Sequence, residues 1–184
     1  MTEQAFNLSQ PIIIFGNGEA PNHPIALKVL KKASTIISLD GGSDKLISMG
    51  YSPDYIVGDM DSLNYDQIKY KTQVILMKDQ SKNDLEKAMD WLVCNKINKL
   101  ELVGCSAARD DHHFANLFIM EKFSNFIDMK MVTNWSVFYC LDGLKTFKSL
   151  PGQTVSIITK NNDVKITTEG LKYSLKNESF NSPS

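Results

Sequence analysis

The sequence predicts an α/β protein, in which a doubly wound, mostly parallel sheet is followed by a smaller C-terminal antiparallel β unit. Up to residue 128, short apolar runs alternate with segments of helical periodicity, which is typical of parallel strands joined by crossover helices. After residue 129, strand-like segments follow one another between turn signals, with no helix of useful length. We therefore expect an α/β domain over residues 1–128 and a β domain over residues 129–184.

The first βα unit is the clearest. Residues 12–15 are an unbroken apolar run that predicts a buried strand, and residues 24–34 place apolar side chains on one helical face, with Pro24 in the first turn. Residues 35–39 predict a second strand, followed by a short helical stretch that ends near Gly50. The remaining expected elements are strands at 53–57, 73–77, 99–103, 129–133, 137–141, 153–159 and 164–168, and helices at 85–92 and 112–123.

Composition excludes several classes of protein. The 184 residues include 20 basic and 21 acidic side chains, so there is no overall positive charge to attract nucleic acid. No apolar run of 18 residues is present, so we expect no membrane span. The three cysteines are widely spaced, and the N-terminus lacks a basic segment followed by an apolar one. We therefore expect a cytoplasmic protein.

Acidic side chains follow several of the predicted strands. Ligands of an open α/β sheet bind beyond the carboxyl ends of its strands, so these carboxylates are expected to gather at one edge. Carboxylates held close together repel one another unless a cation neutralises them. The residues concerned are Asp40, Asp59, Asp61, Asp79, Asp84, Asp110 and Asp111.

The chemistry of these ligands favours magnesium. All of them are oxygen donors, and no Cys-x-x-Cys or His-x-x-x-His pair that would suit zinc lies nearby. Magnesium is commonly bound by one or two carboxylates together with substrate phosphates, so a nucleotide or diphosphate substrate is expected. Arg109, the only arginine in the chain, could grip a phosphate with its forked guanidinium.

Each motif also has a simpler interpretation. Residues 58–62 could be a solvated turn, and residues 40–42 a tight turn. Asn83 or Asp84 could serve only as the cap of the following helix. Residues 16–18 begin like a dinucleotide-binding fingerprint, but Pro21 stands where its third glycine should be, and no P-loop motif is present.

Taken together, the motifs resemble those of the thiamine pyrophosphokinase family. The resemblance extends over about residues 12–184, and its strength lies in the order and spacing of the whole set. The matching segments are Asn17-Gly18-Glu19, Asp40-Gly41-Gly42, Pro53-Asp54 with Gly58-Asp59-Met60-Asp61-Ser62, Asp79-Gln80 with Asn83-Asp84-Leu85-Glu86-Lys87-Ala88, Arg109-Asp110-Asp111-His112 with Asn116, and Gly170-Leu171-Lys172-Tyr173-Ser174-Leu175.

The resemblance implies that the C-terminal β domain is an antiparallel β-sandwich. It also implies a homodimer that transfers pyrophosphate from ATP to thiamine with Mg²⁺, and that holds thiamine near the subunit interface. It also implies that Asp59, Asp61 and Asp84 bind the metal, and that these three act with Arg109 and Asp111 in catalysis. Asp111 and Asp84 are both possible acceptors of the hydroxyl proton. The residues implied in substrate binding are Asp40, Gly41, Gln80, His112 and Asn116.

The sequence departs from the family pattern in three places. Ala107 and Ala108 stand where the family has glycines, and Asp110 stands where it has an apolar residue, which puts the loop geometry in question. The family also continues beyond the point where this chain ends, so we expect the C-terminal unit to be truncated at Ser184.

Two other functions remain open. One is a module that binds thiamine or nucleotide without turnover, for which Ala107 and Ala108 are the main support. The other is a metal-dependent nucleotide-sugar transferase, which would use Asp59 and Asp61 but leave the other motifs without a role.

Overall fold

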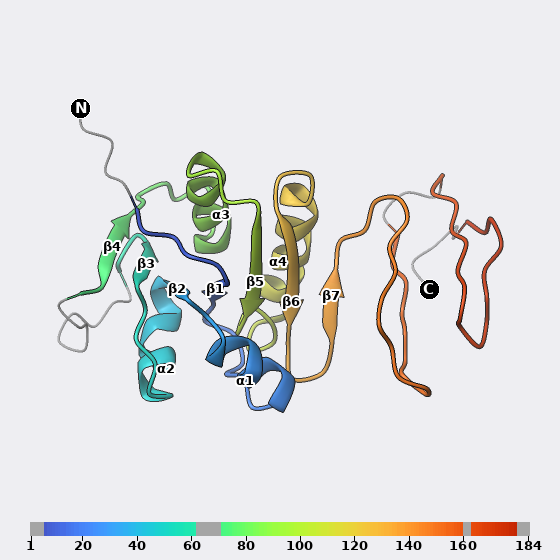
Figure 1. Ribbon diagram of the computed structural model, residues 1–184. Helices are drawn as coiled ribbons and strands as arrows, with labels where there is room; N and C mark the ends of the chain where they lie inside the picture. The colour runs from blue at the N-terminus through green and yellow to red at the C-terminus, as the bar shows by residue number, and fades with distance from the viewer. Residues whose placement is uncertain (1–5, 62–70, 160–162, 180–184) are drawn as a thin grey trace. The chain divides into compact units, whose positions relative to one another are not determined.

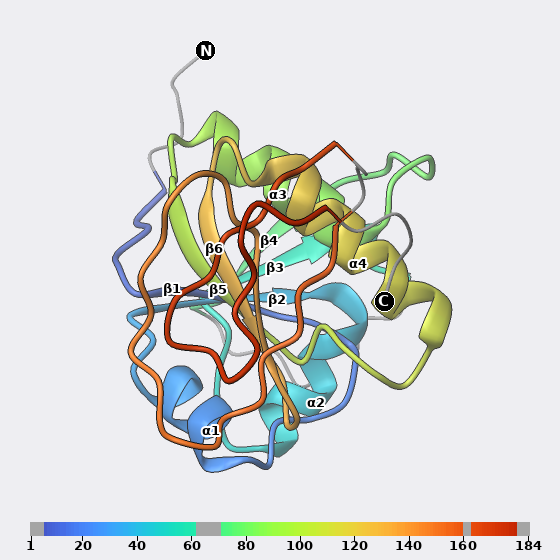
Figure 2. The same ribbon diagram turned by 90° about the vertical axis from the view of Figure 1, so that its right-hand side faces the viewer.

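The first structural unit is a seven-stranded, mostly parallel sheet with helices on both faces (Figures 1 and 2). A computed structural model describes residues 6–61, 71–159 and 163–179, and Ser62 of the predicted motif lies outside these ranges. Strand order is β4-β3-β2-β1-β5-β6-β7. The elements are β1 (Ile12–Phe15), α1 (Pro24–Lys31), β2 (Thr35–Leu39), the 3₁₀ turn η1 (Asp40–Gly42), α2 (Ser43–Ser48), β3 (Tyr55–Gly58), β4 (Gln73–Leu76), α3 (Asp84–Cys94), β5 (Lys99–Val103), α4 (Asp110–Phe123), β6 (Asp128–Val132) and β7 (Val137–Tyr139).

Strand β1 lies in the middle of the sheet and is buried along its whole length. Its side chains alternate between the two faces of the sheet, as the pleat requires. Ile12 and Ile14 belong to the core cluster that includes residues of α3 and α4. Ile13 and Phe15 belong to a second cluster, which includes Leu30 of α1 and Leu46 of α2. The continuous apolar run of β1 therefore follows from helices covering both faces.

The order of the strands reverses beside β1. Strands β2, β3 and β4 extend the sheet to one side of it, and β5 and β6 extend it to the other, all parallel to their neighbours. In an open sheet of this kind, ligands bind beyond the carboxyl ends of the strands near this reversal. The predicted doubly wound sheet is confirmed, and it directs attention to the loops after β1, β2, β3 and β5.

The end of the sheet differs from the sequence expectation. The sequence places the segments 129–133 and 137–141 in the C-terminal β domain. In the structure they correspond to β6 and β7, which are part of the first sheet. Strand β6 pairs in parallel with β5, and only β7 is antiparallel. The first compact unit accordingly runs to Leu144, and not only to residue 128. The reason is that the crossover through α4 delivers β6 beside β5, which the later turn-rich pattern does not reveal.

The second compact unit spans Lys145–Ser184. Within its described part, an isolated antiparallel bridge joins Ile166 to Glu178, and the backbone N–H of Thr168 donates to the carbonyl of Leu175 at 3.0 Å. No strand forms over 153–159 or over 164–168, the two segments expected to be strands. The antiparallel pairing is thus limited to one short hairpin, and such a hairpin is only marginally stable by itself.

Among the residues that the structure describes, no helix is both long enough and apolar enough to cross a bilayer.

Candidate active site

Three neighbouring strands deliver carboxylates to one edge of the sheet. Asp40 begins the turn directly after β2, and Asp59 and Asp61 follow β3. Asp84 is the first residue of α3, which follows the next strand of the sheet, β4. The expectation that the carboxyl ends of the strands bring separate acidic motifs together is met for this part of the chain.

Asp40, Asp59 and Asp61 form the tightest group. One carboxylate oxygen from each lies within 4.8 Å of the others. Asp40 is buried, with 2% of its surface exposed, whereas Asp61 is exposed. Oxygen donors at such spacing fit a hard divalent cation such as Mg²⁺. The group contains Asp40 in place of Asp84, which the resemblance placed with Asp59 and Asp61 as a metal ligand.

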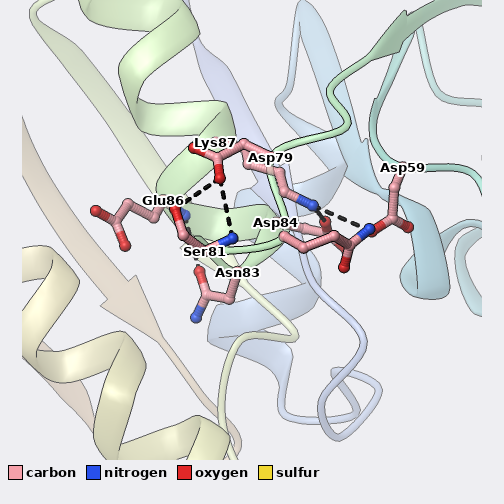
Figure 3. Close-up of polar contacts among 8 residues, drawn as sticks. Asp59, Asp79, Ser81, Asn83, Asp84, Glu86 and Lys87 are labelled. Carbon is pink, nitrogen blue, oxygen red and sulfur yellow. Dashed lines mark hydrogen bonds and ion pairs between the residues drawn. The ribbon is translucent and has the colours of Figure 1, made fainter.

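Asp84 is instead bound to a lysine of its own helix (Figure 3). Lys87 Nζ lies 3.0 Å from Asp84 Oδ1 and 3.2 Å from Asp59 Oδ2. Gln80 Nε2 donates to the same oxygen of Asp59 at 2.9 Å. The hydrogen bond from Lys87, followed by that from Gln80, holds the pKa of Asp59 below its usual value. Asp59 is therefore a charged carboxylate in a fixed orientation.

Asn83 resolves the question of the helix cap. Its side chain accepts a hydrogen bond from the backbone N–H of Glu86 at 2.9 Å, so Asn83 is the N-cap of α3. Asp84 is thereby left to face Lys87. Asp79 forms a local turn, in which its carboxylate accepts from the backbone N–H and the hydroxyl of Ser81 at 2.9 and 2.6 Å. Figure 3 shows both arrangements.

The motif at the start of α4 has a different local structure. Arg109 Nε and Nη2 donate to the two carboxylate oxygens of Asp111 at 3.1 and 2.6 Å, and both side chains are exposed. The hydrogen bond from Arg109 is the main cause that lowers the pKa of Asp111 to about 2. The guanidinium of Arg109, which is expected to bind phosphate, thus forms an ion pair with Asp111 through Nε and Nη2. The side chain is exposed to solvent.

Asn116 joins three parts of this edge. Its side-chain amide donates to the carbonyl of Cys105 at 2.8 Å and accepts, at 3.5 Å, from Asn83 at the start of α3. It therefore connects α4 to the loop after β5 and to the cap of α3. His112 is exposed next to this region, on the first turn of α4.

The loops after β1 and β5 pack directly against each other. The N–H of Gly18 donates to the carbonyl of Gly104 at 2.6 Å, and the N–H of Glu19 donates to the carbonyl of Ser106 at 2.8 Å. A side chain on Gly18 would collide with the carbonyl oxygen of Ser106. Glycine is therefore required in the Asn-Gly-Glu motif because of this close approach.

The two alanines that replace family glycines keep a glycine-like backbone. Ala107 has φ of 55° and Ala108 has φ of 67°, both in the left-handed region that side chains disfavour. Both alanines are exposed. The alanines therefore do not prevent a loop with positive φ values, although this conformation costs energy for any residue other than glycine.

Sequence reasoning missed Lys87. The resemblance includes Lys87 in a matching segment but implies no role for it. The available signal is its position three residues after Asp84, directly before the apolar residues Ala88 and Met89. Gly58 was also passed over, although an added Cβ there would lie 2.6 Å from the Cβ of Asp40.

Comparison with known proteins points to one family. The chain is 26% identical over 150 residues to thiamine pyrophosphokinase 1 of rice, a match that covers 73% of this chain and 57% of the rice protein. The chain thus spans less than two thirds of that relative.

Solved structures show the same fold. A thiamin pyrophosphokinase family protein from Enterococcus faecalis matches with a TM-score of 0.65 and 17% identity over 95% of this chain and 86% of that one. The thiamin pyrophosphokinase of Geobacillus thermodenitrificans matches with a TM-score of 0.54 and 25% identity, over 67% of this chain and 59% of that one.

The profile of the family described as "Thiamin pyrophosphokinase, catalytic domain" matches residues 26–133. This match includes β2, β3, α3 and the start of α4, the elements that carry the carboxylates and Arg109. Because it covers more than half of the 184 residues, the chain belongs to the thiamin pyrophosphokinase family.

Proposed function

We propose that this protein transfers pyrophosphate from ATP to the primary hydroxyl of thiamine, giving thiamine diphosphate and AMP. In this reaction the hydroxyl oxygen bonds to the β-phosphorus of ATP, and the bond from that phosphorus to the α–β bridging oxygen breaks. AMP leaves, and the hydroxyl proton passes to an acceptor. The observation that carries the proposal is the meeting of Asp40, Asp59 and Asp61 from two adjacent strands, in a chain of this family.

Asp40, Asp59 and Asp61 would hold Mg²⁺. Asp84, which shares the ammonium of Lys87 with Asp59, would be a further ligand. A bound Mg²⁺ would neutralise charge on the phosphate oxygens and orient the triphosphate. The carboxylates of this chain supply the binding energy and the orientation. Catalysis then rests mainly on positioning and charge compensation, as in phosphoryl transfer generally.

Arg109 would bind phosphate oxygens, and Asp111 would respond to that contact. While Arg109 holds it, Asp111 has a pKa of about 2 and is a weak proton acceptor at neutral pH. If Arg109 turns to a phosphate, the pKa of Asp111 returns towards its ordinary value, and Asp111 accepts a proton more readily. Asp84 is the alternative acceptor, and its carboxylate lies 3.0 Å from Lys87 Nζ.

Gln80, His112, Asn116 and Gly41 complete the proposed substrate site. The proposal also includes a homodimer with the thiamine site near the subunit interface, a β-sandwich fold for the C-terminal unit, and a cytoplasmic location. Gln80 supports this assignment because its amide already binds Asp59, so a ligand that contacts Gln80 would lie beside the carboxylates.

A product assay by ³¹P NMR tests the proposal. Protein, Mg²⁺, ATP and thiamine are incubated together, and AMP should appear in step with thiamine diphosphate. ADP and thiamine monophosphate as the main products would contradict transfer of the diphosphate as a unit. Binding of thiamine or ATP without AMP formation would instead support a binding module. Release of a nucleoside diphosphate from a nucleotide sugar, with no AMP formed from ATP and thiamine, would support the transferase alternative.

A further inference from the structure

Lys87 is a buried cation within the acidic edge. Only 3% of its side chain is exposed, although lysine is among the residues least often buried. It lies on α3 next to the core residues Leu85 and Ala88. An apolar side chain would fill such a position at less cost, because an ammonium group loses its hydration there.

The contacts of Lys87 explain why a charge is kept. Its Nζ lies 3.0 Å from Asp84 and 3.2 Å from Asp59, so one ammonium binds carboxylates from two different chain segments. Asp59 belongs in turn to the group formed with Asp40 and Asp61. Without a positive charge, these four carboxylates would repel one another in the free protein.

Asp40 and Asp84 both lie close to Gly58. An added Cβ on Gly58 would lie 3.3 Å from the carboxylate of Asp84 and 2.6 Å from Cβ of Asp40. Asp40 and Asp84 thus both border the space that a side chain at position 58 would occupy. The charge of Lys87 is therefore placed where carboxylates after β2, β3 and β4 converge.

We propose that Lys87 is the resident cation of this site: it holds Asp59 and Asp84 in place in the free protein, before a divalent cation or a substrate arrives. This inference deepens the proposed function, since it concerns the same carboxylates, and it makes Lys87 a positioning residue. A consequence is that removing the ammonium should make the fold depend on an added divalent cation.

Thermal unfolding of Lys87→Met tests this directly. Methionine has nearly the same length but no charge. In EDTA, we expect the Tm of Lys87→Met to fall by about 5 to 10 °C, since breaking a buried ion pair leaves its partners uncompensated. Saturating Mn²⁺, used as the probe, should raise the Tm of the variant roughly twice as much as that of the wild type.

Lys82→Met is the matched control. Lys82 also pairs with an aspartate, Asp90 at 2.7 Å, but both side chains are more than one third exposed. Its loss should change the Tm by no more than about 3 °C and leave the Mn²⁺ response as in the wild type. Equal Tm losses in the two lysine variants, or an unchanged Mn²⁺ response in Lys87→Met, would overturn the proposal.

A double-mutant cycle with Asp59→Asn separates charge from packing. Removing one acid relieves part of the repulsion, so Lys87→Met should cost fewer degrees in the Asp59→Asn background than in the wild type. This comparison also serves if Lys87→Met alone does not fold, because folding of the double variant would then itself show the coupling. Additive losses, or a double variant that is unfolded as well, would indicate that Lys87 acts by packing alone.

These measurements need no catalytic turnover. If the protein makes no thiamine diphosphate but the Tm pattern appears, the proposed reaction fails and the role of Lys87 stands. If thiamine diphosphate forms and the Tm pattern is missing, the reaction stands and the role of Lys87 fails.

Discussion

A Cβ atom on Gly58 would lie 2.6 Å from the Cβ of Asp40, closer than real Cβ contacts come. Gly58 is the last residue of β3, and Asp40 directly follows the neighbouring strand β2. The absence of a side chain at position 58 is therefore what allows the carboxylates after two adjacent strands to stand side by side.

Gly58→Ala should accordingly disturb both stability and the site. We expect a loss of about 1 to 3 kcal/mol in the free energy of unfolding, as for other overpacked positions, measured by urea denaturation. Mn²⁺ binding should weaken because Asp40 must shift. Gly143→Ala is the control for backbone strain without a clash, since Gly143 also has a positive φ, of 67°, but nothing lies within 4 Å of an added Cβ there. A Gly58→Ala protein that binds Mn²⁺ like the wild type would show that the contact is not needed.

Asp59→Asn and Asp61→Asn should each lower turnover by about two to three orders of magnitude, because each removes a charge from the proposed cation site. The loss of stability should be small, since each change also removes repulsion between like charges, and in Asp59→Asn the ammonium of Lys87 keeps Asp84 as a partner. Turnover is measured by AMP formation and stability by thermal unfolding. Asp128→Asn is the control, because that carboxylate is largely exposed and its lysine is 4.0 Å away. Near-normal turnover in both site variants would indicate that residues 58–61 form a turn and do not bind a cation.

The sequence predicts most of the first unit because its signals are local. The apolar runs of β1, β2 and β5 reveal buried parallel strands, and Asp59 stands out because it directly follows such a strand. The membership of β6 and β7 in the same sheet depends on pairing across the chain, and their sequence resembles the antiparallel pattern that follows.

The details of the site that sequence reasoning missed are contacts between segments. The ion pair of Lys87 with Asp59 spans 28 residues, so no local pattern indicates it. The pairing of Arg109 with Asp111 is local, but an arginine that is expected to bind phosphate gives no reason to expect the two side chains to bind each other. The β-sandwich expected for the C-terminal unit stays a prediction.

Arg109→Lys tests the value of the guanidinium fork. Lysine keeps the charge but cannot donate two parallel hydrogen bonds to one phosphate or carboxylate. We expect kcat/KM for ATP to fall by about tenfold or more, since one charge-assisted hydrogen bond is lost. Lys122→Arg is a control for the reverse exchange at an exposed position of α4, where Lys122 pairs with Glu86. The hypothesis fails if Arg109→Lys retains wild-type kinetics for ATP and thiamine.

The same arginine predicts a pH effect. Asp111 has a pKa of about 2 beside Arg109, below its ordinary value, so the pair stabilises the fold above pH 4 and loses this effect as the pH falls towards 2. In Arg109→Met, the carboxyl pKa of Asp111, followed by ¹³C NMR, should rise to near the ordinary value of about 4. Acid unfolding of that variant should lose the component that depends on Asp111. An unchanged titration of Asp111 would mean that Arg109 does not hold it in solution.

Thiol labelling should report on the packing of the loops after β1 and β5. Cys105 is 3% exposed, burial raises its pKa to about 12, and an added Cβ on Gly16 would lie 2.8 Å from its Sγ. At pH 8 only about one Cys105 in ten thousand would carry the reactive thiolate.

Cys94 is exposed, so Ellman's reagent should label it rapidly in the native protein and reach Cys105 only when these loops open. Cys94→Ser should remove the fast phase, and guanidinium chloride should restore labelling of Cys105. Mg²⁺ with ATP should slow the labelling of Cys105 further if the nucleotide binds at this edge and holds the loops closed. Rapid labelling of Cys105 in the free protein would instead mean that the loop carrying Arg109 is open for much of the time, and that the phosphate site forms only when the substrate binds.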